Sequence, residues 1–199
     1  MRLDFFKGWI NVSLHPWMSV FAEAVNRKSH IVTFLSITIA SLFGLGLSRV
    51  IHILTGQNPN EFKGLVSAWV DSTTQPPFFS WSIIISFGVI VGFYDFQIVL
   101  LIFARLPGGK GSLGTQAYLQ SLLYAPLVII QQTLIVIPIV GFVLFILVAV
   151  YSLIPTTNSL KAAHEYSTKK AILTWLLPIL LNISIIYLVT MILISRSPQ

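Results

Sequence analysis

Few residues in this chain have the type and position needed for chemistry, and Asp95 is the most conspicuous of them. It is the only carboxylate within the long apolar segments of the sequence, and Tyr94 and Gln97 lie beside it. A charged side chain at the bilayer centre costs about 2.5–3.5 kcal/mol on insertion scales, so Asp95 should face a partner, a cavity or the membrane surface. Two interpretations stay open: a proton or cation relay or protein contact, or a structural carboxyl that is protonated or paired with Lys or Arg.

Signatures of enzymatic chemistry are incomplete. His164 and Glu165 begin like the helical motif of zinc proteases, but the fourth residue after His164 is Thr168 and no second histidine follows. In the glycine-rich loop, Lys110 precedes Gly111, whereas a phosphate-binding loop has Ser or Thr there. The chain also has no cysteine, which removes thiolate nucleophiles and thiolate metal ligands. The sequence therefore predicts a protein that is not an enzyme and that needs no cofactor or metal.

The cationic residues occur in small groups beside apolar segments. The formal net charge is +6, but no basic stripe runs along the chain as nucleic-acid binding would require, so no nucleic-acid partner is expected. Near a membrane, each Lys contributes about 1 kcal/mol of attraction to anionic lipids. The expected contacts with partner proteins or lipid headgroups are Asp95, the glycine loop at Gly108, Gly109 and Lys110, and three lysines farther along the chain, Lys161, Lys169 and Lys170.

The elements that must position these residues are membrane-spanning helices. Of the 199 residues 55% are hydrophobic and only 9% are charged, whereas a soluble domain carries about 25% charged residues. A span needs about 20 apolar residues. The sequence predicts an all-α polytopic bundle with five spans, at about residues 31–54, 78–103, 118–136, 138–155 and 171–194. A short surface helix is expected within residues 61–70 of the first long connection.

Residues 118–155 carry no charge and contain Pro126 and Pro138. As one helix they would be about 57 Å long, nearly twice the hydrocarbon thickness of about 30 Å. Two spans joined by a tight turn between Gln131 and Gly141 fit the length better. The sequence thus predicts a helical hairpin here.

The distribution of basic residues predicts the orientation of the bundle. With the N-terminus inside and five spans, nine of the twelve Lys and Arg residues lie in cytoplasmic segments, as the positive-inside rule requires. A single crossing by residues 118–155 would translocate Lys161, Lys169 and Lys170 and weaken this asymmetry. We therefore expect a cytoplasmic N-terminus and a C-terminus outside.

The first 28 residues form a separate segment before the membrane domain at 29–199. Apolar residues recur there at spacings of three and four, with Trp9 and Trp17 among them and Pro16 as an interruption. This pattern predicts an interfacial amphipathic helix with both tryptophans as anchors at headgroup depth. The alternative is a helix packed against the cytoplasmic mouth of the bundle.

The order of these features resembles the Yip family, small five-span membrane proteins named for interaction with Ypt and Rab GTPases. The resemblance is carried by the loop at Gly108–Ser112, the following Tyr124-Ala125-Pro126, and Ala171 after a basic pair. The short N-terminal region is similar to that of prokaryotic members, which implies a prokaryotic inner membrane. A Rab GTPase partner is therefore not carried over.

Two functional hypotheses follow. The first is a non-enzymatic scaffold or adaptor that organises the membrane and contacts proteins or anionic lipids through its cytosolic loops. The alternative is a small transporter or channel component that uses Asp95 with polar residues of the third to fifth spans, such as Gln131, Gln132, Asn182 and Ser184. Against transport stands the absence of an internal inverted repeat.

Overall fold

The computed structural model describes residues 5–27, 29–55, 78–134, 137 and 140–196. Within these residues the regular elements are all helical, which confirms the predicted all-α class. The surface helix expected within residues 61–70 lies outside the described residues. The elements are α1 (Phe5–Leu14), α2 (Met18–Ala24), the 3-10 helix η1 (Val25–Arg27), α3 (His30–Thr55), α5 (Phe78–Arg105), α6 (Leu113–Leu134), α7 (Val140–His164) and α8 (Thr168–Arg196).

Five of the described helices are long and apolar enough to cross a membrane, as the sequence predicts. They are α3, α5, α6, α7 and α8. Serine side chains begin two of them: Ser29 Oγ accepts the Val32 N–H before α3, and Ser112 Oγ accepts the Thr115 N–H before α6. Such caps satisfy backbone donors that a helix leaves open in its first turn. The chain is therefore a multi-pass integral membrane protein.

The predicted hairpin forms, with α6 ending at Leu134 and α7 beginning at Val140. The backbone N–H of Ile137 donates to Leu134 O at 2.9 Å, and the N–H of Gly141 donates to Ile137 O at 3.0 Å. These bonds close the tight turn between the two helices. The turn lies within the interval expected from the sequence.

The fourth span is longer than expected. The sequence predicts that it ends at Pro155, but α7 continues to His164. A proline inside a helix removes one backbone hydrogen bond, and membrane proteins tolerate this where neighbouring Ser and Thr side chains bond the backbone. Here Ser152 Oγ donates to Ala149 O and Thr157 Oγ1 donates to Leu153 O, the carbonyls two residues before and after Tyr151, whose own backbone donor the proline removes. Much of the expected polar connection is therefore helix.

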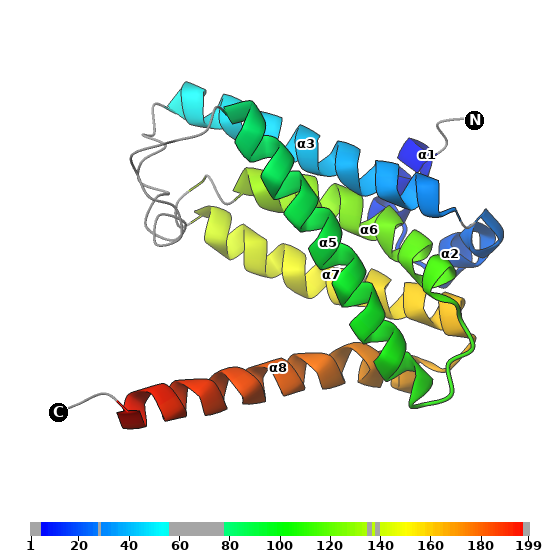
Figure 1. The fold of residues 1–199 in the computed structure, drawn as a ribbon. Helices are drawn as coiled ribbons and strands as arrows, with labels where there is room; N and C mark the ends of the chain where they lie inside the picture. Colours follow the sequence, from blue (N-terminus) through cyan, green and yellow to red (C-terminus); the bar gives the residue numbers. More distant parts are fainter. Residues whose placement is uncertain (1–4, 28, 56–77, 135–136, 138–139, 197–199) are drawn as a thin grey trace.

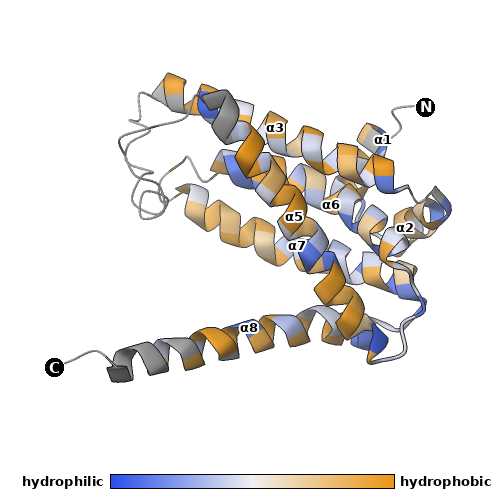
Figure 2. Cartoon of the chain, viewed as in Figure 1, coloured by the Kyte–Doolittle hydropathy of each residue, from blue (hydrophilic) through white to orange (hydrophobic). Residues whose placement is uncertain are grey.

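Helix α6 is the centre of the bundle. It packs against α1, α3, α5 and α7, and most of its first four turns are buried. By contrast, α8 packs on α5 and α7 near its beginning and then diverges from the other helices (Figure 1). From Leu180 to Leu188 every residue of α8 is exposed. Figure 2 shows that hydrophobic residues predominate in α5 and in the first half of α7, and many of them are exposed, as contact with lipid tails requires.

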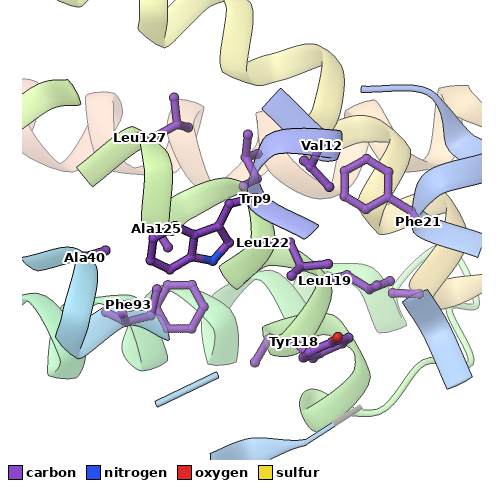
Figure 3. Packing of buried hydrophobic residues seen from close by; sticks show 14 of the residues in the cluster. Trp9, Val12, Phe21, Ala40, Phe93, Tyr118, Leu119, Leu122, Ala125 and Leu127 are labelled. Atoms are coloured by element: carbon purple, nitrogen blue, oxygen red, sulfur yellow. The ribbon is translucent and has the colours of Figure 1, made fainter. Parts of the chain in front are cut away.

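The N-terminal helices pack against the bundle. Trp9 and Val12 of α1 and Phe21 of α2 are buried in the core together with residues of α6 such as Leu119 and Leu122 (Figure 3). The opposite side of this segment is exposed and apolar, with Phe6, Ile10, Leu14 and Trp17. This packing agrees with the second interpretation from the sequence, and the exposed apolar side is compatible with the first. Exposed apolar residues remain on the outer side of the same helix.

Candidate functional site

One end of the bundle collects the cationic residues singled out in the sequence. At this end α5 and α7 finish and α3, α6 and α8 begin; we call it the basic end. Arg105 is the last residue of α5, Lys110 lies in the following loop, and Lys161 belongs to the last turn of α7. Lys169 and Lys170 are in the first turn of α8. The structure therefore brings all four predicted lysines to the same end.

The loop from Gly108 to Ser112 is held against the end of α5. The two terminal nitrogens of Arg105 donate to Gly109 O and Gly111 O, both at 2.9 Å. The backbone N–H of Gly109 donates a hydrogen bond to Ala104 O at 2.9 Å. Gly108 has φ +88°, a conformation that residues with a Cβ rarely adopt. The arginine thus closes the chain reversal that follows α5.

His164, at the end of α7, fixes the loop from the other side. Its Nδ1 accepts the backbone N–H of Gly111 at 3.1 Å, and its Nε2 lies 2.8 Å from Gln116 Oε1. Because a backbone N–H can only donate, Nδ1 carries no proton and Nε2 donates to Gln116. The imidazole is therefore neutral, and both of its nitrogens are engaged. It offers no free lone pair to a metal or to a substrate.

The network continues into the bundle through two glutamines. Gln116 Nε2 donates to both the backbone oxygen and Oε1 of Gln97, each at 2.9 Å. His164, Gln116 and Gln97 are at most 1% exposed. Buried polar groups are stabilising only when they are hydrogen-bonded, and this chain of bonds meets that requirement. It joins α5, α6 and α7 to the glycine loop, and we refer to these residues with Arg105 as the loop clamp.

Glycine is required in the loop because of the close approach of His164. A Cβ at Gly109 would lie 2.7 Å from His164 Nδ1 and 2.6 Å from Ala104 O. A Cβ at Gly111 would lie 2.9 Å from the same nitrogen and would also meet the carbonyl of Ala163. Real Cβ atoms essentially never come this close. The two glycines therefore allow the loop to seal against the imidazole.

The turn after His164 packs against the face of the imidazole ring. Glu165 has φ +56°, and Tyr166 stacks on His164 with ring centroids 5.3 Å apart. The Tyr166 hydroxyl donates to Thr174 Oγ1 at 2.8 Å, because that oxygen itself donates to Lys170 O. Burial raises the pKa of Tyr166, and its hydrogen bond with Thr174 acts in the opposite direction. The phenol therefore stays neutral and ties α7 to α8.

The predicted contact residues have different environments within this arrangement. Lys110 is exposed, although its backbone lies between two fixed glycines and its N–H is 3.5 Å from His164 O. Lys169 and Lys170 are also exposed, and Lys161 is half-buried. Gly109 is buried by the loop clamp, whereas Gly108 is exposed. The clamp thus presents the Lys110 side chain from a fixed position.

The loop clamp is not predicted from the sequence, where His164 is a candidate only for a zinc ligand and Gln97 is only a neighbour of Asp95. One available signal was a pair of glutamines, Gln97 and Gln116, in otherwise apolar helices, because a buried amide needs several partners. Another was the strongly glycine-rich loop. Neither signal identifies the histidine, which is distant in the sequence.

Asp95 faces outward from α5. Its side chain is exposed, and it forms no hydrogen bond or ion pair with the part of the chain that the structure describes. The polar residues proposed to work with it lie elsewhere: Asn182 and Ser184 bond carbonyls of their own helix, and Gln132 approaches Ser41 at 3.5 Å. The structure therefore does not join these groups into one site around Asp95.

The two tryptophans predicted as interfacial anchors differ. Trp9 is buried at 7% exposure, and its Nε1 donates to Ser36 Oγ of α3 at 3.0 Å. Its position among helices corrects the expectation that its ring contacts headgroups. Trp17, at 63% exposure, is free of this packing and faces outward.

Comparison with known proteins gives one match. The family model described as the Yip1 domain matches residues 10–190. No curated protein and no solved structure matches the chain. The match covers α2 to α8 almost completely, together with the loop clamp.

Proposed function

Because the chain belongs to the Yip1 domain family of membrane proteins, we propose that it is a non-enzymatic scaffold that organises the cytosolic leaflet around its basic end. The observation that carries this proposal is the fixed presentation of Lys110 at the end of the bundle that also holds the exposed pair Lys169 and Lys170. The ligands of this surface are anionic lipid headgroups. Other membrane proteins with acidic cytosolic segments fit the same charges.

The charge distribution at the start of α8 supports an anionic ligand. The first turn of a helix carries a partial positive charge, which acidic side chains usually offset. In α8 this turn contains Lys169 and Lys170 and no acidic residue. The arrangement is unfavourable for the isolated helix and becomes favourable when phosphate groups lie nearby.

The orientation follows from the same residues. All four lysines and Arg105 lie at the basic end, and the positive-inside rule assigns such an end to the cytosol. Five spans then place the C-terminal end of α8 on the opposite side. The segment with α1 and α2 lies near the basic end as well (Figure 1), and we expect the exposed apolar side of α1 and Trp17 to insert into the cytosolic leaflet there.

Lipid selectivity tests the proposal. The variant with Lys110, Lys161, Lys169 and Lys170 all changed to Gln should lose most of the preference for anionic over zwitterionic lipids, because each Lys contributes about 1 kcal/mol. Association of spin-labelled lipids with the reconstituted protein measures this preference. Arg49→Gln, at the opposite end of α3, is the matched control and should keep it. Unchanged selectivity in the fourfold variant would remove the proposal.

Transport through the bundle has less support. The polar residues once grouped with Asp95 bond their own helix or a neighbouring one, as described above. A flux assay with reconstituted protein separates the two functions. Equal and negligible flux for the native chain and Asp95→Asn is expected for a scaffold. Flux that disappears in Asp95→Asn would instead identify a transporter.

A further inference from the structure

Helix α1 joins three helices of the bundle. Trp9 Nε1 of α1 donates to Ser36 Oγ of α3 at 3.0 Å. One turn later, Ser13 O accepts the hydroxyl of Tyr151 from α7 at 2.8 Å. Along the same stretch α1 packs on α6, and Figure 1 shows it beside the beginning of α3. The ten residues of α1 therefore bridge α3 and α7 over the surface of α6.

These contacts place α1 deeper than the cationic residues of the basic end. Ser36 lies six residues after the start of α3, about 9 Å along the helix. Leu122, against which Gly8 of α1 packs, lies nine residues after the start of α6, about 14 Å along it. Tyr151 lies ten residues before Lys161, about 15 Å along α7. Half of a hydrocarbon core is about 15 Å thick, so α1 lies at the depth of one leaflet.

The chain returns to the basic end directly after α1. Asn158 Nδ2 donates to Pro16 O at 2.7 Å, and Asn158 lies only three residues before Lys161 in α7. After α2 and η1, the chain enters α3 at His30, again at the basic end. Helix α1 thus belongs to one leaflet, whereas the five spans belong to both.

The outer side of α1 is apolar. Residues four positions apart lie along one side of a helix, and Phe6, Ile10 and Leu14 form such a line. Ile10 and Leu14 are 59% and 68% exposed. The neighbouring cytosolic halves of α3 and α7 also expose apolar side chains, Ile31 and Ile154. The apolar line therefore continues the lipid-facing surface of the spans, and its neighbours are acyl chains.

A polar line borders the apolar one. Lys7, Asn11 and His15 each follow a residue of the apolar line by one position, about 100° around the helix. All three are exposed. Adjacent polar and apolar lines are typical of a helix that lies in the plane of a membrane, with headgroups on one side and acyl chains on the next. The remaining side of α1, with Trp9 and Val12, is buried on the bundle.

We propose that α1 is a wedge in the cytosolic leaflet, and that it makes the protein favour membranes that are convex toward the cytosol. The apolar line lies among acyl chains and the polar line among headgroups. The five spans displace lipid from both leaflets, whereas α1 displaces it from one, and expansion of one leaflet favours curvature toward that side. This wedge rests on the proposed function for the cytosolic orientation of the basic end, and not for the binding of anionic lipids.

The depth of α1 can be measured with a nitroxide on a single cysteine, because the native chain contains none. At Ile10→Cys and Leu14→Cys, the nitroxide should be more accessible to oxygen, which dissolves in hydrocarbon, than to a nickel chelate that stays in water. Asn11→Cys, on the polar line, is the matched control and should show the opposite preference. Higher nickel accessibility at Ile10 and Leu14, or one preference at all three positions, would overturn the wedge.

Curvature preference is tested with narrow tubes pulled from giant vesicles of phosphatidylcholine, with the basic end facing outward. The fluorescently labelled native protein should be enriched on the tube about two-fold over the vesicle. The double variant Ile10→Ser with Leu14→Ser should lose this enrichment. The matched control is Ile183→Ser with Ile186→Ser, at exposed apolar positions of α8, and it should keep the enrichment.

The outcomes separate the wedge from the binding of anionic lipids. The vesicles carry no net charge, so the variant with Lys110, Lys161, Lys169 and Lys170 changed to Gln should be enriched like the native chain. No enrichment of the native chain, or equal enrichment of the Ile10 and Leu14 double variant, would overturn the wedge. Either result would leave the lipid selectivity of the basic end unaffected.

Discussion

At the level of single residues, His164 acts through two hydrogen bonds and not through its acid–base chemistry. Its Nδ1 is occupied by the Gly111 N–H and its Nε2 by Gln116. The sequence shows a histidine beside a glutamate, which is a common pattern in catalytic motifs. The structure shows a structural histidine that holds a loop. The residue type alone could not distinguish these roles, because the partners lie about fifty positions away in the chain.

Removing the imidazole should destabilise the protein. His164→Ala leaves the Gly111 N–H and Gln116 Oε1 without partners, and each such group costs about 1–3 kcal/mol. We expect a loss of about 2–4 kcal/mol in the free energy of unfolding, measured by denaturant titration in mild detergent. His15→Ala, at an exposed position, should have little effect. Equal stability of the two variants would show that the loop clamp does not stabilise the fold.

A methyl group in the loop should act on the same contact. Gly111→Ala should lower the midpoint of thermal unfolding, because its Cβ would meet His164 and the Ala163 carbonyl. Gly46→Ala, within α3 and in open space, should instead raise stability by up to about 1 kcal/mol through helix propensity. Thermal unfolding followed by circular dichroism measures both. The prediction is wrong if the two variants shift in the same direction.

At the level of elements, the sequence predicts the helices better than it predicts their ends. Apolar segments of sufficient length identify all five spans, and the hairpin turn falls in the expected interval. The end of α7 was misplaced at Pro155, because a proline that stops a soluble helix is tolerated where side chains bond the backbone around it. The packing of α1 could not be decided either, since an amphipathic stripe fits lipid and protein equally well.

Two hydrogen bonds from α7, besides that of Trp9 with Ser36 of α3, hold the N-terminal helices on the bundle. Tyr151 Oη donates to Ser13 O at 2.8 Å, and Asn158 Nδ2 donates to Pro16 O at 2.7 Å, both from α7. The double variant Tyr151→Phe with Asn158→Leu should weaken the attachment of the segment between α1 and α2 to α7. We expect amide hydrogen exchange in residues 13–20 to rise about ten-fold, as for a loss of roughly 1–2 kcal/mol of local stability.

The exchange experiment has an internal reference. Amides in α6, which is packed on several sides, should keep their protection in the double variant because the core remains intact. Unchanged exchange in residues 13–20 would mean that Trp9, Val12 and Phe21 hold the segment without these bonds. A loss of protection in α6 as well would indicate global destabilisation.

At the level of the whole molecule, composition predicts that the helices lie in a lipid bilayer, and charge predicts which end faces the cytosol. Neither predicts the contacts between helices. The content of charged residues identifies a membrane protein, and the four lysines of the candidate site lie at one end of the described helices. The positive-inside rule predicts that this end faces the cytosol. The divergence of α8 and the network through Gln97 and Gln116 depend on side-chain packing between distant segments. A single sequence contains no direct record of such pairs. The placement of the candidate site was therefore predictable, and its internal geometry was not.

The proposed function requires that the basic end lies in the cytosol, and the side of the membrane on which it lies can be measured directly. The chain lacks cysteine, so a single cysteine at Lys110 and, separately, one appended after Gln199 can be labelled with a membrane-impermeant maleimide in intact cells. We predict that the appended cysteine reacts from outside, whereas Lys110→Cys reacts only after the membrane is opened. Reaction of both cysteines from the same side, or of Lys110→Cys in intact cells, would contradict five spans with the loop clamp in the cytosol.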